Sequence, residues 1–260
     1  MAARSPTRSF PRVLAVVGGI ALSAGAEPAA ADVTVGSALG ARADLVTSCR
    51  SPGGCTAAAA GLGGRPVAIG ADGVIVRWRI RAATRGTAAL RVLRPEAGGA
   101  YASVGAGPRQ LLAKRPRAGR DAAYVFAVRI PVQRGDRLAV DLGRGPAGVY
   151  HLRREAGFAT LGFEPAITGD QPRVATSALD GAELLINADV ELDADGDGFG
   201  DETQDNCPTI PNDQTTNPCP STAVPPSGSA GPGSSGARRS RTTRFRRHKP
   251  VRRSGFRAVR

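Results

Sequence analysis

The chain has 260 residues, with 35 Lys and Arg against 22 Asp and Glu, and its formal net charge is +13 at pH 7. The excess of positive charge is terminal, because residues 1–31 and 238–260 carry all of it and residues 32–237 have no net charge. The composition therefore excludes a polyanion-binding role based on the overall charge of the body, and confines such a role to the ends.

The first 31 residues have the features of an export signal. A basic start is followed by an apolar run from Val13 to Leu22 and by three alanines before Asp32. The apolar run is only about half of the roughly 20 residues that span a bilayer. A signal peptide removed after Ala31 is therefore favoured over a retained membrane helix. No later segment approaches transmembrane length, so we expect a mature chain that is secreted or held at the cell surface without a transmembrane span.

Four cysteines agree with export, because oxidising compartments allow disulfides to form. Cys49 and Cys55 flank a short, turn-rich loop, and Cys207 and Cys219 bracket a second one. Four cysteines allow three pairings, and closeness along the chain favours pairing within each loop. A zinc site is disfavoured, because neither spacing is a CxxC knuckle and both histidines lie far from the cysteines.

Between residues 70 and 192 the apolar residues alternate, which is typical of strands buried on one face. Glycine and proline clusters separate the runs, which cover residues 74–80, 90–92, 124–130, 138–142 and 184–190. Seven or more short antiparallel strands over about 160 residues predict a mainly β fold, a β-sandwich or jelly-roll-like domain spanning residues 32–192.

The first of these runs, GVIVRWRIR, is expected to place two sets of side chains on opposite faces: Val74, Val76, Trp78 and Ile80 on one, and Arg77, Arg79 and Arg81 on the other. Because Trp78 is expected to share a face with apolar residues, we predict that it is a core residue and not an exposed aromatic that stacks on sugars. The arginines are expected to form a solvated face, with an anionic ligand as the alternative.

The stretch DADGDGFGD places carboxylates at alternate positions, at Asp193, Asp195 and Asp197, and a further one at Asp201. A glycine permits the sharp turn, and the carbonyl of Phe199 adds an oxygen, so the stretch can begin an oxygen cage for calcium. A solvated acidic linker is the alternative. The flanking residues argue against an EF-hand, which needs a helix on each side of its loop: the preceding LLINADVEL alternates like a strand, and CPTIPNDQ follows.

Together with DNCPTIPNDQ, this stretch resembles a thrombospondin type 3 repeat over residues 193–214. The resemblance implies an irregular segment, here residues 193–219, that binds Ca²⁺ through Asp193, Asp195, Asp197, the Phe199 carbonyl, Asp201 and Asp205. The chain departs from the family in having one copy and in placing Asp205 four residues after Asp201 instead of three. The resemblance further implies a calcium-set spacer, so that chelation would loosen the junction without unfolding the sandwich.

Residues 220–236 are a Pro/Ser/Gly linker that cannot bury enough apolar surface to fold, and residues 237–260 form an Arg-rich tail that we expect to be disordered. The tail would bind polyanions through counterion release. An anionic cell-wall polymer or polysaccharide is the expected partner, with no specific nucleic acid; a solvated end without a partner is the alternative. The residues expected to bind the polyanion are Arg238, Arg239, Arg241, Arg244, Arg246, Arg247, Lys249, Arg252 and Arg253.

The sequence contains no GxSxG elbow, no HExxH motif and no phosphate-binding glycine loop. His151 alternates with strand residues and His248 lies in the tail, so neither is expected to be a general base. We therefore predict a secreted or cell-surface binding or structural module with a calcium-stabilised loop, and no catalysis. The alternative is an extracellular carbohydrate-binding or hydrolase accessory domain, and a two-carboxylate hydrolase stays open.

Overall fold

The computed structural model describes residues 33–113, 121–215 and 219. The predicted mainly β fold is confirmed, with fifteen strands and one short 3-10 turn, η1 (Ala97–Gly99), in the described chain. The signal peptide, the linker and the Arg-rich tail were predicted for residues that lie outside this description. Among the described residues, none of the helical structure is long and apolar enough to cross a membrane.

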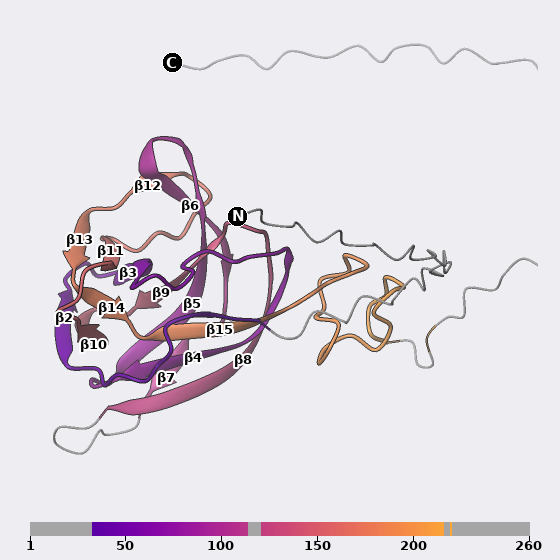
Figure 1. Cartoon of the computed structure of the whole chain (residues 1–260), viewed down its shortest axis with the longest axis horizontal. Coiled ribbons are helices and arrows are strands. Elements are labelled where there is room, and N and C mark those ends of the chain that lie inside the picture. The colour runs from indigo at the N-terminus through magenta and orange to yellow at the C-terminus, as the bar shows by residue number, and fades with distance from the viewer. Residues whose placement is uncertain (1–32, 114–120, 216–218, 220–260) are drawn as a thin grey trace, which may run out of the picture. The chain divides into compact units, whose positions relative to one another are not determined.

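The strands form three antiparallel sheets (Figure 1). The first has the order β1 (Val33–Gly36), β15 (Ile186–Glu191), β4 (Gly73–Ala82), β8 (Ala122–Val132), and the second has the order β14 (Ala182–Leu184), β10 (Gly145–Leu152), β2 (Leu45–Cys49). The third has the order β12 (Arg173–Val174), β6 (Ala100–Ala106), β5 (Gly86–Pro95), β9 (Arg137–Leu142), β3 (Cys55–Leu62), β11 (Phe158–Phe163), β13 (Ser177–Asp180), and β7 (Gln110–Leu112) pairs with β5.

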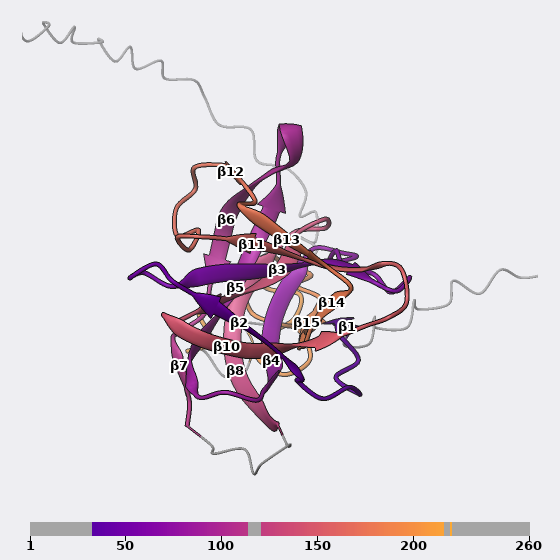
Figure 2. The same cartoon turned by 90° about the vertical axis from the view of Figure 1, so that its left-hand side faces the viewer.

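The first two sheets are joined through Leu185, the residue between β14 and β15. Its N–H donates to the carbonyl of Val149 at 3.0 Å, and its own carbonyl accepts from Arg81 N at 3.1 Å. The main apolar cluster contains side chains from these two sheets and from the third sheet, among them Leu90 and Val140. Figure 2 shows β11, β3 and β13 of the third sheet side by side, as their pairing requires. The arrangement is a β-sandwich with one central core.

Trp78 lies in this core, as predicted. Its side chain is fully buried, and its ring centroid is 5.1 Å from that of Phe126 on β8. An aromatic pair at this distance adds to the stability that burial of each ring provides. Trp78 is therefore part of the packing between the sheets and is not available to stack on a sugar.

The third sheet is buried on both faces, so several of its strands do not show a clear alternation of apolar and polar residues. Leu138 and Val140 on β9 face the central core, whereas Ala139 between them joins a second apolar cluster. The second cluster also contains Phe163 and Ile167, so residues after β11 cover the outer face of this sheet. Strands with two buried faces have near-continuous apolar runs instead of alternation.

The expectation that Val74 and Val76 share the core face with Trp78 is wrong. The pairing of β4 with β15 shifts register between Asp189 and Val190, where Val76 is an extra residue on β4 and forms an irregularity of the β-bulge type. Ile75, and not its two neighbours, packs in the central core with Trp78. Because side chains alternate along a strand, one extra residue moves all preceding side chains to the other face. Val74 and Val76 are nevertheless buried, at 0% and 6% exposure.

The arginines of β4 form neither a freely solvated face nor an open anion site. Arg77 and Arg79 bind the carboxylate of Asp189 on β15, with N–O distances of 2.5 and 2.7 Å, and Thr34 donates to the same carboxylate at 2.9 Å. Arg81 binds Asp121 at 2.6 Å. The charges are therefore neutralised by carboxylates of neighbouring segments, a contact that strand alternation alone cannot reveal.

Both predicted disulfides are present. Cys49 and Cys55 join β2 to β3 with their Cα atoms 5.3 Å apart. Cys207 and Cys219 close a second loop, with a Cα–Cα separation of 5.5 Å. Each bond lowers the conformational entropy of the unfolded chain, and both fit a protein made in an oxidising compartment.

We expect Asp189→Asn to lower the free energy of unfolding by roughly 2 kcal/mol, because the arginines lose a buried charged partner but remain partly hydrated. Burial alone would raise the pKa of Asp189, but hydrogen bonds from Arg79, Thr34 and Arg77 lower it below its usual value. Its contribution to stability is therefore complete above the ordinary aspartate pKa of about 4 and is lost as pH falls through the lower folded pKa.

Urea unfolding of the wild type and the variant at pH 7 and at pH 3 measures this contribution. Asp170→Asn is the matched control, since Asp170 is exposed and accepts a long hydrogen bond of 3.5 Å from Gln171 Nε2. Equal loss of stability in the two variants at pH 7 would refute the role of the buried ion pair.

Candidate metal centre

The acidic loop, residues 193–214, follows β15 directly and contains no regular helix or strand (Figure 1). The strand that precedes it confirms the expectation from LLINADVEL. An EF-hand places its loop between two helices, so this segment is not of that kind. The loop folds on itself through side chains that bind neighbouring backbone amides.

Asp193, Asp195 and Asp197 come together in the first part of the loop. One carboxylate oxygen from each lies within 4.8 Å of the others. Asp193 accepts hydrogen bonds from Gly196 N at 2.8 Å and Gly198 N at 2.9 Å. The two glycines have φ values of +79° and +85°, a conformation that other residues rarely adopt. The glycines between the aspartates thus allow the chain to wrap its carboxylates around one point.

The other two predicted carboxylates lie outside this tight group but in the same fold of the chain. Asp201 accepts from Ala194 N at 3.1 Å, which brings the ninth loop position back to the second. Asp205 accepts from Gln214 Nε2 at 2.7 Å, and the same amide group lies 3.3 Å from Asp197. Gln214 was not identified from the sequence as a site residue. It joins the two halves of the loop through both carboxylates.

Burial and the negative charges of neighbouring aspartates disfavour the ionised form of two carboxylates in the loop. Burial raises the pKa of Asp195 above its usual value, and the nearby charges of Asp197, Asp205 and Asp193 raise it further, against a hydrogen bond from Asp197 N. Burial also raises the pKa of Asp201, with the same three neighbours adding to the effect against a hydrogen bond from Ala194 N. The charge of Asp205 therefore acts on both Asp195 and Asp201.

Several buried oxygens of the loop lack a hydrogen-bond donor among the described residues. They are Asp195 Oδ2, Asp205 Oδ2 and Gln204 Oε1. Leaving a buried carboxylate oxygen without a donor costs free energy. Hard cations such as calcium bind oxygen ligands of this kind, so the predicted residues could hold such an ion through their carboxylates and the Phe199 carbonyl.

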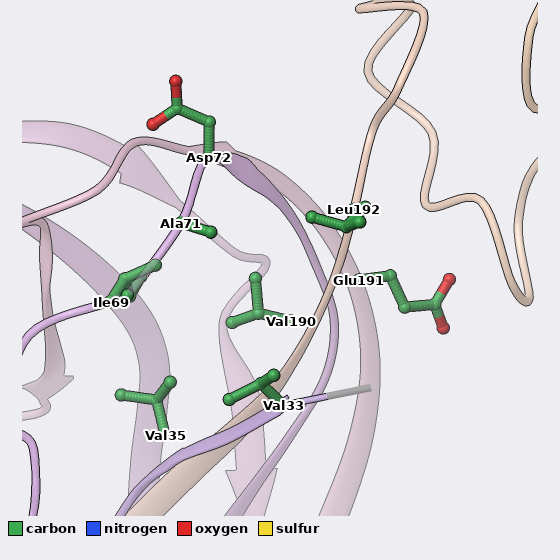
Figure 3. A pocket seen from close by; sticks show the side chains of 9 residues that line it. Val33, Val35, Ile69, Ala71, Asp72, Val190, Glu191 and Leu192 are labelled. Atoms are coloured by element: carbon green, nitrogen blue, oxygen red, sulfur yellow. The ribbon is translucent and has the colours of Figure 1, made fainter. Parts of the chain in front are cut away.

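The acidic loop is attached to the sandwich by Glu191, the last residue of β15. Its carboxylate is only 1% exposed and accepts from Glu202 N at 3.0 Å, Thr203 N at 2.9 Å and Thr203 Oγ1 at 2.6 Å. In Figure 3 this carboxylate points away from the apolar side chains of Val190 and Ile69, as strand alternation requires. Glu191 therefore belongs to the loop side of β15 and holds the loop against the sheet.

Further contacts extend this attachment over β4 and β8. A Cβ atom at Gly200 would lie 2.5 Å from Oε2 of Glu191 and 2.8 Å from Cγ1 of Val76, so only glycine allows this close approach. The guanidinium of Arg129 lies 3.9 Å from the centroid of the Phe199 ring, and Gln204 Nε2 donates to the carbonyl of Val128 at 2.9 Å. The loop therefore covers the outer face that the β-bulge gives to Val76.

Other parts of the molecule offer weaker candidates. A pocket of about 110 Å³ beside β1 is lined mainly by apolar side chains such as Val35 and Ile69 (Figure 3). His151 Nδ1 lies 2.8 Å from a carboxylate oxygen of Asp44, which also accepts from Leu152 N, so this pair fixes β10 to the chain before β2. None of the large exposed apolar side chains of the described chain is aromatic. A flat aromatic platform for sugar stacking is thus not found there.

Comparisons with protein-family models, with curated proteins and with solved structures gave no match. The resemblance to a thrombospondin type 3 repeat therefore depends on the residues of the acidic loop alone.

We expect Glu191→Ala to release the acidic loop from β15. Three hydrogen bonds to a buried carboxylate are lost, so the free energy of unfolding should fall by about 2–3 kcal/mol. Hydrogen exchange should also become faster at the amides of Glu202 and Thr203. Amide exchange followed by NMR, together with urea unfolding, measures both effects.

Glu202→Ala is the control for this experiment. It removes one carboxylate from an exposed side chain, while its backbone N–H remains available to Glu191. Unchanged exchange at Thr203 in the Glu191 variant would show that the carboxylate does not hold the loop.

Proposed function

We propose that this chain is an extracellular binding or structural module in which calcium binds the acidic loop and fixes it against the β-sandwich. The observation that carries the proposal is the set of carboxylate oxygens gathered within 4.8 Å at Asp193, Asp195 and Asp197. The unpartnered buried oxygens of Asp195 and Asp205 support it, because a cation would supply the missing positive partner.

Charge explains why the ion would matter for the structure. In the free protein, burial and the charges of the neighbouring aspartates raise the pKa of Asp195 and of Asp201, so assembling the loop has an electrostatic cost at neutral pH. A bound cation turns this electrostatic repulsion into attraction, since each carboxylate then faces a positive charge. The loop already folds back through Asp201 and Gln214, so few further groups need to be ordered when the ion binds.

Attachment of the loop gives calcium an influence on the domain. The segment of Gly200 to Gln204 follows the carboxylates directly and contacts β15, β4 and β8 through Glu191, Val76 and Val128. An ion that orders the loop would therefore stabilise these contacts as well. This supports a rigid terminal element over a flexible spacer, and the two disulfides fit secretion to a calcium-rich exterior.

Isothermal titration calorimetry of the full chain with CaCl₂ tests the proposal. We expect binding with a Kd of about 10⁻⁴ to 10⁻³ M, the range of extracellular calcium modules. The triple variant Asp193→Asn, Asp195→Asn, Asp197→Asn should lose it. At roughly ten times the Kd, calcium should stabilise the wild type by about 1.4 kcal/mol and leave the variant unchanged.

The stability of the same variant, compared with that of the wild type, should depend on whether calcium is present. In EDTA it should be more stable than the wild type by about 1–2 kcal/mol, because the carboxylate repulsion is relieved. In saturating calcium this difference in the free energy of unfolding should become smaller or change sign, because calcium stabilises only the wild type. Asp170→Asn, Asp180→Asn, Glu155→Gln changes the charge equally at exposed positions and serves as the control. No heat of binding in the wild type would make the loop an acidic linker without a metal.

A further inference from the structure

Three exposed arginines surround a shallow pocket at the end of the sandwich where β4 ends. The pocket lies between the turn from β4 to β5 and the turn from β9 to β10, and Arg85 and Arg144 are part of its lining. Arg109, which precedes β7, donates from its guanidinium to Thr87 Oγ1 at 3.0 Å, and Thr87 lines the same pocket. The three side chains come from three separate connections of the fold.

The two turns are held together by backbone hydrogen bonds. Ala83 N donates to the carbonyl of Gly148 at 2.7 Å, and Gly143 N donates to that of Thr87 at 3.0 Å. The hydroxyl of Thr84 accepts from Gly148 N at 2.9 Å. These bonds fix the backbone on both sides of the pocket, so the positions from which Arg85 and Arg144 extend are preorganised for binding.

The positive charge at this pocket is not neutralised locally. No aspartate or glutamate lines it, and none of the ion pairs found in the described chain includes Arg85, Arg109 or Arg144. Six other arginines of the described chain do have carboxylate partners, namely Arg77, Arg79, Arg81, Arg91, Arg94 and Arg153. An uncompensated group of guanidinium ions attracts anions, even on a body with no net charge.

We propose that this basic pocket binds sulfate or phosphate ester groups of an anionic polysaccharide. Guanidinium groups match the geometry of oxyanions and bind them through paired hydrogen bonds, and the hydroxyl of Thr87 adds a donor. The cavity of about 20 Å³ holds at most part of one oxyanion group, so the sugar ring would lie outside it. No aromatic side chain lines it, so it lacks the stacking surface that nucleobases use.

This pocket is separate from the acidic loop. The loop contacts β4 near its start, at Val76, whereas Arg85 follows the end of this ten-residue strand. The six steps of strand from Val76 to Ala82 extend over about 20 Å. Calcium and the polysaccharide would therefore bind independently, and loss of calcium binding would leave the anion site intact.

The test uses the full chain with ¹⁵N-labelled arginine and a fully sulfated heparin tetrasaccharide. The Nε–Hε signals of Arg85, Arg109 and Arg144, assigned from single Gln variants, should shift together and saturate. The Arg-rich tail also carries arginines, so these individual signals separate the pocket from the tail. In Arg85→Gln, the Kd reported by Arg109 and Arg144 should increase about tenfold, as for loss of one charge-assisted contact.

Arg42→Gln is the matched control, because Arg42 is exposed and the variant loses the same charge. It should leave the Kd reported by Arg109 unchanged. Equal weakening in both variants, or shifts confined to arginines outside the pocket, would overturn the proposal. It would also be overturned if vesicles of phosphatidylglycerol shifted the three signals and the tetrasaccharide did not, since the partner would then be a membrane surface.

Discussion

The buried carboxylate of Glu191 is the interaction on which the acidic end of this molecule depends. It terminates the strand β15, faces away from the central core and accepts three hydrogen bonds from the segment behind the aspartates. Such a charged group is buried only where donors replace its lost water. Because these donors come from the acidic loop, folding of the loop and burial of Glu191 require one another.

The outer face of the first sheet follows the same rule. Asp189, two residues before Glu191, is buried under Arg77 and Arg79, and its neighbour Val76 is covered by Gly200 of the loop. β15 thus has a polar face that is closed by arginines at one position and by the acidic loop at the next. In this arrangement the loop acts as part of the second layer of packing on that sheet, and an ion that orders it would act on the whole face.

Sequence patterns predicted the features that local residue order determines. The alternation in β8 and β9, the burial of Trp78 and the two disulfides between cysteines close in the chain were all correct, whereas in β4 the alternation was correct only from Arg77 onward. The acidic stretch was identified because its aspartates alternate with glycines. The clustering of Asp193, Asp195 and Asp197 follows from that spacing, whereas binding of calcium stays a prediction.

Contacts between distant segments could not be predicted in this way. The bulge at Val76 arises where β4 pairs with β15, and the partner of Arg77 and Arg79, Asp189, lies 112 and 110 residues away along the chain. The role of Glu191 was hidden because nothing in ADVEL indicates which side chain a later loop will meet. The bulge, the ion pairs and the contacts of Glu191 all depend on tertiary packing, which cannot be inferred from the residue pattern of a single strand.

The most direct test of this account is the amide NMR spectrum of the full chain with and without calcium. The account predicts changes at Glu191, Val76 and Val128 of the sheet as well as at the aspartates of the loop, with one common Kd. Changes confined to residues 193–205, with the sheet signals unmoved, would contradict the claim that the acidic loop transmits calcium binding to the sandwich.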